Sequence, residues 1–383
     1  MQVEPFRMER MQSEWENRVA HNLSESGVHP MSVGELLGGD SADVLRGERL
    51  LYVQSNGSED LRRAIAALYP GAGPDNVVVT NGTAEANYIS VWRLVEPGDE
   101  VVMMLPNYMQ TWGVVRAQGA TVVPWRLREE ASWAPDLDDL RRAITSRTRV
   151  IIVCNPNNPT GSILSVAAMR EIAAVAAKAG AWILADEVYR GAERTDDETP
   201  TFWGMHDRLL VTCGLSKAYG LPGLRIGWVV GAADTVAQLW GRKDYLTISP
   251  GALSDVLARR ALDPGTRPRI LERTRGILRR NYPLVESWVS ARRPAIRMVP
   301  PRAGAIAYLR YAWRVNSVEL VERLRDEHGV LIVPGDHFGM DGFLRVGFGN
   351  EPADLEAGLR RMAAHLDTLT PDAPQGRALG TGP

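Results

Sequence analysis

The 383-residue sequence predicts an α/β fold, with a large domain built on a mostly parallel central sheet covered by helices and a smaller α+β domain. Short apolar runs alternate with helical patterns between about residues 58 and 250, which is typical of a parallel sheet that is buried on both faces. The chain is also too long for one small domain. The expected strands lie at residues 76–79, 100–104, 150–153, 181–184, 209–212 and 226–230.

The order of the elements suggests where the domains begin and end. Residues 58–264 are expected to form the large domain. Residues 265–370 are expected to form a second domain. It would contain a long Arg-rich helix, short strands at residues 305–309, 330–332 and 344–346, and a closing helix from about Asp354. Residues 1–57 are expected to join that second domain. Residues 371–383 are rich in Pro and Gly, and we expect a disordered tail there.

The composition excludes several classes of protein. A net charge of −2 gives no bulk electrostatic reason for binding nucleic acid or a membrane. Residues 1–18 are charged and lack the apolar core of a signal peptide, and no run is long enough to cross a bilayer. Cys154 and Cys213 lie in apolar runs, which favours buried thiols in a reducing compartment. We therefore expect a cytoplasmic protein, and no metal site is expected.

Lysine is scarce in this chain, because only three of its 44 basic residues are lysines. Lys178 and Lys243 suit ordinary surface positions. Lys217 instead lies in a turn rich in Gly and Pro, between Ser216 and Arg225. Arginine stays protonated, whereas a desolvated lysine can lose its proton and form a Schiff base. Taken alone, Lys217 suits a surface residue and a nucleophile equally well.

Polar residues at the ends of the expected strands suggest a phosphate site. Gly82, Thr83 and Ala84 follow a strand and open a helix, where free amides and a hydroxyl can hold an anion. Alone, such a motif is more often an ordinary turn. Arg225 is placed between a Gly-Leu pair and an apolar strand, and its guanidinium could give a second, bidentate phosphate contact.

Other polar residues stand where an apolar run ends or within one. Asp186 ends a strand and needs a cation or donor as partner, such as a protonated ring nitrogen, unless it caps the next helix. Asn158 and Tyr189 could donate hydrogen bonds to a phenolate-like oxygen. Arg345 is a charge inside an apolar strand, and such an arginine usually holds a carboxylate, either internal or from a substrate.

Together these residues supply a reactive lysine, an acid for a ring nitrogen, a phosphate cradle and a carboxylate clamp. Pyridoxal 5'-phosphate requires that set. Over almost its whole length the sequence also resembles the class I/II aminotransferase superfamily of fold-type I enzymes. The matching pieces are residues 155–161, residues 186–189, Ser216-Lys217 with Arg225, and Arg345.

The resemblance implies a homodimer with shared active sites, in which Lys217 holds the cofactor as a Schiff base and takes the substrate's α-proton. It implies that Asp186 pairs with the pyridine nitrogen and that Arg345 binds the α-carboxylate of an amino-acid substrate. The further implied cofactor contacts come from Asn158, Tyr189 and Tyr108 at the ring, from Gly82, Thr83, Ala84, Ser216 and Arg225 at the phosphate, and from Tyr52 at the partner's phosphate. Many relatives carry a hydroxyl residue where this chain has Gly214, so one phosphate contact is missing or replaced.

The N-terminal region also resembles that of PLP-dependent arginine oxidases at residues 15–17 and 22–30. There the segment folds over the active site, a Glu like Glu16 meets the guanidinium, and a His like His29 steers the outcome with oxygen. A carboxylate is the natural bidentate partner of a guanidinium, and a histidine can move protons near neutral pH. The favoured hypothesis is therefore an oxygen-dependent oxidase or hydroxylase of L-arginine or a close analogue, with Glu16 binding substrate and His29 catalytic.

Three alternatives stay open. A conventional aminotransferase using a 2-oxo acid is second. Third is a cyclase similar to the capreomycidine synthases, which cyclise a hydroxylated arginine and share part of the region around residues 26–29. The aminotransferase form of residues 186–189 weighs against the cyclase. A regulator that binds the cofactor without turnover is disfavoured, because no helix-turn-helix pattern precedes the shared region.

Overall fold

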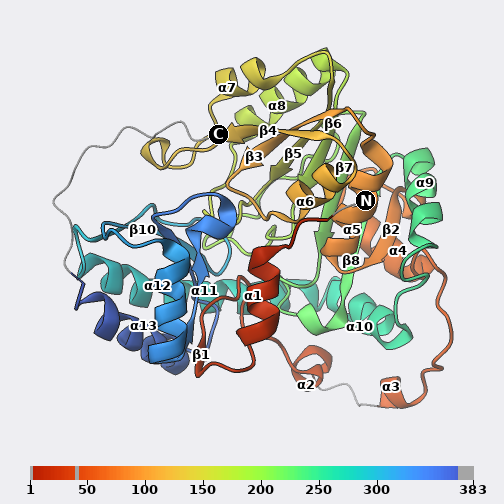
Figure 1. Ribbon diagram of the computed structural model, residues 1–383. Helices are drawn as coiled ribbons and strands as arrows, with labels where there is room; N and C mark the ends of the chain where they lie inside the picture. The colour runs from red at the N-terminus through yellow and green to blue at the C-terminus, as the bar shows by residue number, and fades with distance from the viewer. Residues whose placement is uncertain (1–2, 39–42, 370–383) are drawn as a thin grey trace.

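The computed structural model describes residues 3–38 and 43–369, so the predicted tail at residues 371–383 lies outside the described residues. Its centre is a seven-stranded sheet in the order β2-β8-β7-β6-β5-β3-β4 (Figure 1). All neighbours are parallel except those of β8, which runs against β2 and β7. The strands are β2 (Val77–Asn81), β3 (Glu100–Leu105), β4 (Thr121–Arg126), β5 (Thr148–Cys154), β6 (Trp182–Asp186), β7 (Leu209–Gly214) and β8 (Ile226–Gly231). The predicted α/β class with a mostly parallel sheet is confirmed.

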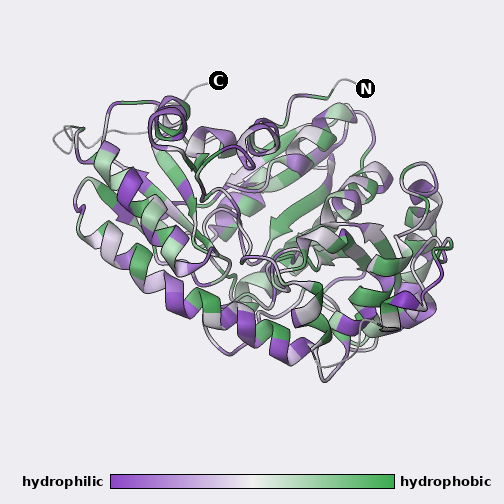
Figure 2. Cartoon of the chain, turned by 90° about the horizontal axis from the view of Figure 1, so that it is seen from below, coloured by the Kyte–Doolittle hydropathy of each residue, from purple (hydrophilic) through white to green (hydrophobic). Residues whose placement is uncertain are grey.

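Helices cover both faces of this sheet because most of its strands are apolar on both sides. One face packs on α5 (Thr83–Leu94), α6 (Gln110–Ala117) and α9 (Ala233–Lys243). The other face packs on α4 (Glu59–Ala66), α7 (Leu137–Ala143), α8 (Val166–Ala179) and α10 (Ala252–Leu262). Successive residues of a strand point to opposite faces, so Val102 joins one core and Val101 the other. Figure 2 shows the hydrophobic strands enclosed by helices with hydrophilic outer faces.

The edge strand β4 was not predicted. Its residues are mostly exposed or half-buried, and Pro124 and Arg126 interrupt the apolar pattern that marks the central strands. Proline is tolerated here because an edge strand has one side without a partner.

The smaller part of the structure packs helices on an antiparallel sheet in the order β12-β13-β10-β9. Its strands are β9 (Ile296–Met298), β10 (Ile306–Tyr311), β12 (Val333–Pro334) and β13 (Phe343–Gly347), and its helices are α11 (Arg267–Ser290), α12 (Ser317–His328) and α13 (Pro352–Leu366). The N-terminal segment is attached here, because β1 (His21–Asn22) pairs in parallel with β11 (Val330–Leu331). Ahead of β1, α1 (Arg7–Trp15) lies between the two parts of the molecule (Figure 1).

One expectation about the lysines is wrong. Lys178 is exposed, but Lys243 is fully buried, where its Nζ donates to the carbonyl oxygen of Ile248. Its position at the end of α9 lets the ammonium cap the turn that follows, and burial lowers its pKa. Lys243 therefore has a structural partner and lies outside the residues that line the cavity described below.

Glu187 is a buried carboxyl that should make stability depend on pH. It accepts hydrogen bonds from Thr201 and from the amide of Phe202, yet burial raises its pKa to about 7. Between pH 4.5 and 7 the unfolded chain has lost this proton while the folded chain keeps it, so stability should fall as pH rises across that window. The loss should be about 3 kcal/mol at most.

Glu187→Gln should abolish that part of the pH dependence, because an amide carries no titrating proton. Urea unfolding of the wild type and Glu187→Gln at pH 5 and pH 8 tests this. Equal pH dependence in the two proteins would contradict the assignment.

Candidate active site

A cavity of about 350 Å³ lies at the carboxyl ends of the parallel strands, and residues of α1 form part of its wall. In a parallel α/β sheet, ligands collect at this edge. Eleven of the residues singled out from the sequence line it: Glu16, Thr83, Ala84, Tyr108, Asn158, Asp186, Tyr189, Ser216, Lys217, Arg225 and Arg345. The structure therefore gathers in one place residues that are separated by hundreds of positions in the chain.

The phosphate end of the cavity is built where α5 begins. Gly82 adopts a φ of +82° ahead of the helix, and a Cβ at this position would overlap Arg225 Nη2. The guanidinium thus lies directly over the free amides at the start of α5, as an anion site needs. Within the described part of the chain, no ion pair joins Arg225 to a carboxylate, so its charge is available to a ligand.

At Gly214, three positions before Lys217, this chain lacks the hydroxyl residue that many relatives have, and the neighbouring Thr83 hydroxyl can take over its contact with the phosphate. A Cβ at position 214 would lie 2.5 Å from Thr83 Oγ1, so no side chain fits there. Thr83 Oγ1 is itself buried and has no hydrogen-bond partner. A buried hydroxyl without a partner is costly, and a bound phosphate would satisfy it. The Thr83 hydroxyl therefore lies next to the position that a hydroxyl side chain at residue 214 would occupy, and it can make the phosphate contact instead.

Gly82→Ala should weaken binding of pyridoxal phosphate by about tenfold or more, since it would force a residue with a Cβ into positive φ and displace the Arg225 guanidinium. Fluorescence or absorbance titration of the cofactor-free protein with pyridoxal phosphate measures this. Gly223→Ala is the matched control, because a Cβ at position 223 meets no atom within 4 Å. Equal affinities for both variants would refute the phosphate site.

Asp186 is held at the end of β6 without a cation. Its carboxylate accepts hydrogen bonds from Asn87 Nδ2 at 3.1 Å and from the amide of Val188 at 3.1 Å. Burial raises its pKa, and these two bonds oppose the rise. Asn87 is oriented in turn by Thr212, whose hydroxyl donates to Asn87 Oδ1 at 2.7 Å. A protonated ring nitrogen in the cavity would give the Asp186 carboxylate the positive partner it lacks.

Lys217 projects into the cavity beside Glu25. Its Nζ lies 3.6 Å from Glu25 Oε2, and the ammonium lowers the pKa of that carboxyl. Gly27 packs against Lys217, because a Cβ at position 27 would lie 3.4 Å from Lys217 Cδ, an ordinary contact distance. Glu25 was not singled out from the sequence, where it lies in a short loop with no pattern of its own.

Arg345 is a buried cation at the other side of the cavity. Its Nη1 donates to Asn158 Oδ1 at 3.0 Å and its Nη2 donates to the carbonyl oxygen of Ser24. Its Nε is buried without a partner, and no ion pair joins it to a carboxylate in residues 3–38 or 43–369. Burial lowers its pKa, so a carboxylate ligand would be strongly favoured. Because Asn158 Oδ1 accepts from Arg345, its amide Nδ2 is left to donate into the cavity.

The N-terminal helix brings acidic residues to the cavity. Glu9 and Glu16 line it together with Glu25, and Glu9 accepts a hydrogen bond from the Tyr108 hydroxyl at 2.9 Å. Burial and then the charges of Glu25 and Glu9 raise the pKa of Glu16, so the three carboxylates act on one another. Sequence reasoning found Glu16 but not Glu9, whose place on a charged helix resembles a solvated face.

Two of the candidates lie away from the cavity. His29 is half-buried between Arg273, 3.1 Å from its Nδ1, and Glu351, 3.2 Å from its Nε2, and burial followed by Arg273 lowers its pKa. The structure therefore does not bring His29 to the cavity wall. Tyr52 is 84% exposed and also lies outside the lining residues.

Several side chains of the cavity lack polar or charged partners, and pyridoxal phosphate would supply them. The buried Thr83 hydroxyl has no partner and suits an anion together with Arg225, and the buried Asp186 carboxylate suits a cation. Lys217 lines the same cavity, in an α/β fold with a mostly parallel sheet. The fold and the site thus define a PLP-dependent enzyme of fold-type I. The sequence model of the family "Aminotransferase class I and II" matches residues 39–362, and the chain belongs to this family.

Two curated relatives show the range of reactions in the family. The chain is 39% identical over 373 residues to a capreomycidine synthase from Streptomyces vinaceus, covering 94% of this chain and 92% of that protein. It is 32% identical over 328 residues to an arginine–pyruvate transaminase from Pseudomonas aeruginosa, covering 82% of this chain and 81% of that protein.

Solved structures with a similar fold also include both an aminotransferase and a cyclase. A PLP-dependent aminotransferase from Streptococcus suis superposes with a TM-score of 0.91 at 31% identity, covering 97% of this chain and all of the other. A PLP-dependent cyclase superposes with a TM-score of 0.88 at 28% identity, covering 96% and 98%. Both kinds of reaction are thus found on this fold.

Proposed function

We propose that this protein is a PLP-dependent enzyme acting on an α-amino acid with a cationic side chain, and that it cyclises a hydroxylated arginine. The observation that carries the proposal is the group of carboxylates from Glu9, Glu16 and Glu25 in the same cavity as Lys217 and Arg345. Arg345 suits the α-carboxylate, and the acidic group suits a guanidinium while repelling an acidic side chain.

The relatives support the cyclase over the hypothesis first favoured from the sequence. Similarity to a capreomycidine synthase extends over 94% of the chain, and a PLP-dependent cyclase shares the fold. The arginine oxidase hypothesis has no support from the proteins compared above, and His29, on which it depended, lies outside the lining residues. An aminotransferase of arginine is the second candidate, favoured by the similarity to the arginine–pyruvate transaminase.

The residues of the cavity have separate roles in the proposed reaction. When bound, pyridoxal phosphate supplies an electron sink for the bonds at the substrate Cα. Lys217 Nζ takes the α-proton and can return one, while Asp186 keeps a positive charge on the ring nitrogen. In the net reaction the Cβ–O bond of the substrate breaks and a bond from a guanidine nitrogen to Cβ forms. The hydroxyl leaves with a guanidine proton, so that one water is lost.

The acidic group positions the guanidinium, and α1 excludes bulk water. The Tyr108 hydroxyl orients Glu9, and Arg7 of α1 forms an exposed ion pair with the smaller part, its Nη1 lying 2.9 Å from Asp336 Oδ2. Holding the guanidine nitrogen near Cβ makes ring closure an intramolecular step, which favours it over addition of water.

Three parallel assays with the purified holoenzyme test the proposal. β-Hydroxyarginine alone should give a product lighter by one water, without oxygen uptake or added 2-oxo acid. Oxygen uptake with L-arginine would establish the oxidase, and turnover that requires pyruvate or 2-oxoglutarate would establish the aminotransferase. Glu16→Gln should reduce turnover of the arginine analogue while leaving the affinity for pyridoxal phosphate unchanged.

We also propose a homodimer in which Tyr52 reaches the partner's phosphate. Support comes from large hydrophobic side chains that are exposed in two separate regions of the chain, Leu50, Leu51 and Tyr52 in one and Tyr245 and Leu246 in the other. Tyr52→Phe should lower the affinity for pyridoxal phosphate in a protein that still sediments as a dimer. Tyr245→Phe serves as the control, and a monomeric wild type would contradict the proposal.

A further inference from the structure

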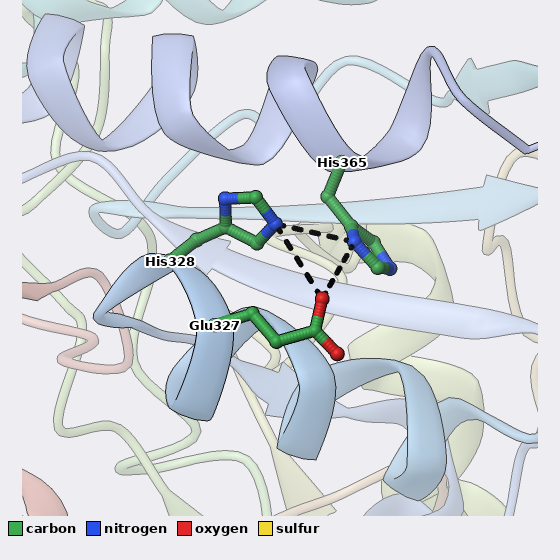
Figure 3. A group of neighbouring side chains, drawn as sticks. All are labelled: Glu327, His328 and His365. Atoms are coloured by element: carbon green, nitrogen blue, oxygen red, sulfur yellow. Dashed lines mark hydrogen bonds and ion pairs between the residues drawn. The ribbon is translucent and has the colours of Figure 1, made fainter.

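A second group of potential ligands lies far from the cavity, where α12 and α13 end side by side. Glu327 and His328 are the last residues of α12, and His365 lies in the last turn of α13. Their side chains converge in Figure 3. His328 Nε2 lies 3.2 Å from His365 Nδ1, and Glu327 Oε2 lies 3.9 Å from the first nitrogen and 3.7 Å from the second.

These distances suit three ligands of one metal ion. Zinc binds histidine nitrogen at about 2.0–2.1 Å and carboxylate oxygen at about 2.0–2.2 Å, so ligand atoms of a tetrahedral site lie roughly 3.4 Å apart. The two nitrogens already lie at that spacing. Glu327 needs to move by only a few tenths of an ångström, and its side chain is 58% exposed and free to do so.

A hydrogen bond between the two imidazoles is the simpler use of this arrangement, but it leaves groups unsatisfied. Such a bond uses one N–H and one lone pair, and it leaves Glu327 Oε2 at 3.9 Å and 3.7 Å from the two nitrogens, too far for a hydrogen bond to either. The nearby guanidinium groups point to other acceptors: Arg325 donates to Asp326, and Arg361 donates to the carbonyl oxygen of His328. Glu327 Oε2 therefore faces two imidazole nitrogens with no arginine between them.

The backbone around the group favours a cation. Both helices end here, and the carboxyl end of a helix carries a partial negative charge. His365 is only 8% exposed and fixes one ligand, whereas His328 is partly open to solvent and gives an ion a way in. Sequence reasoning expected no metal site, because 37 positions separate His328 from His365 and only the packing of α12 on α13 joins them.

We propose that Glu327, His328 and His365 form a binding site for a divalent transition metal such as Zn²⁺, with water completing the coordination. The site is separate from the active-site cavity, none of whose lining residues belongs to it. Bound metal would join the ends of α12 and α13 next to β11, the strand that holds the N-terminal segment through β1.

Calorimetric titration of the tag-free holoenzyme with ZnCl₂ tests this proposal. The wild type should bind one ion per chain, and His328→Gln and His365→Ala should each weaken binding by about tenfold or more, since loss of even an indirect supporting residue costs that much. His206→Gln, in the large domain, is the control and should bind as the wild type does. Zn²⁺ should also raise the Tm of the wild type but not that of His328→Gln.

The proposal fails if the wild type shows no saturable binding, or if His328→Gln binds Zn²⁺ as tightly as the wild type. If His365→Ala does not fold, the partly exposed His328 still gives a decisive variant. Binding that is lost in Glu25→Gln but kept in His328→Gln would place the ion in the cavity instead and would also overturn the proposal.

Discussion

Lys217→Ala should lose turnover of its amino-acid substrate by a factor of about 10²–10⁴ or more, the usual contribution of a general acid–base group. Among the described residues, Lys217 is the lysine whose Nζ reaches the cavity. The variant should still bind pyridoxal phosphate through the Thr83 and Arg225 end, but without a band that borohydride removes. Steady-state assay and absorption spectra before and after borohydride measure both effects.

Lys178→Ala is the matched control for that experiment, because Lys178 is exposed on α8 and does not line the cavity. It should keep full activity and the original spectrum. If Lys217→Ala retained both the band and the activity, the role given to Lys217 would be wrong.

Arg345→Lys should raise KM for the amino acid by roughly 10- to 150-fold, which corresponds to about 1.5–3 kcal/mol for hydrogen bonds to a charged group. A lysine can place a charge near the α-carboxylate but cannot hold both of its oxygens at once. The buried guanidinium also donates to Asn158 and to the carbonyl oxygen of Ser24, so some loss of kcat is expected as well.

Arg225→Lys distinguishes a specific effect on substrate from general damage. Arg225 lies at the phosphate end, so its replacement should weaken cofactor binding with a smaller effect on KM measured at saturating pyridoxal phosphate. Unfolding curves check that Arg345→Lys is folded. An unchanged KM in a folded Arg345→Lys protein would show that Arg345 does not bind the substrate α-carboxylate.

The central sheet and most of the cavity could be predicted because the signals are local. Buried strands produce apolar runs, and the polar residues that follow them, such as Asp186 and Asn158, must lie at one edge of a parallel sheet. The edge strand β4 lacks that apolar run and was missed. The family resemblance then placed Arg345, which lies in another part of the fold, in the same site.

Other features depend on contacts that no local pattern records. Asn87 orients Asp186 across 99 positions, and Glu25 meets Lys217 only because the N-terminal segment folds back through β1. Lys243 looks like a surface residue in the sequence but is buried by the turn that it caps. His29 follows a suggestive motif, yet its ring packs between Arg273 and Glu351.

The most direct test of the central claim is to locate the cofactor on the chain. Reduction of the holoenzyme with borohydride, followed by proteolysis and peptide mass spectrometry, fixes any Schiff base at the lysine that formed it. With three lysines in the sequence, the outcome is unambiguous. We predict a pyridoxyl-phosphate group on the peptide that contains Lys217. A label on Lys178 or Lys243, or no label at all, would contradict the account.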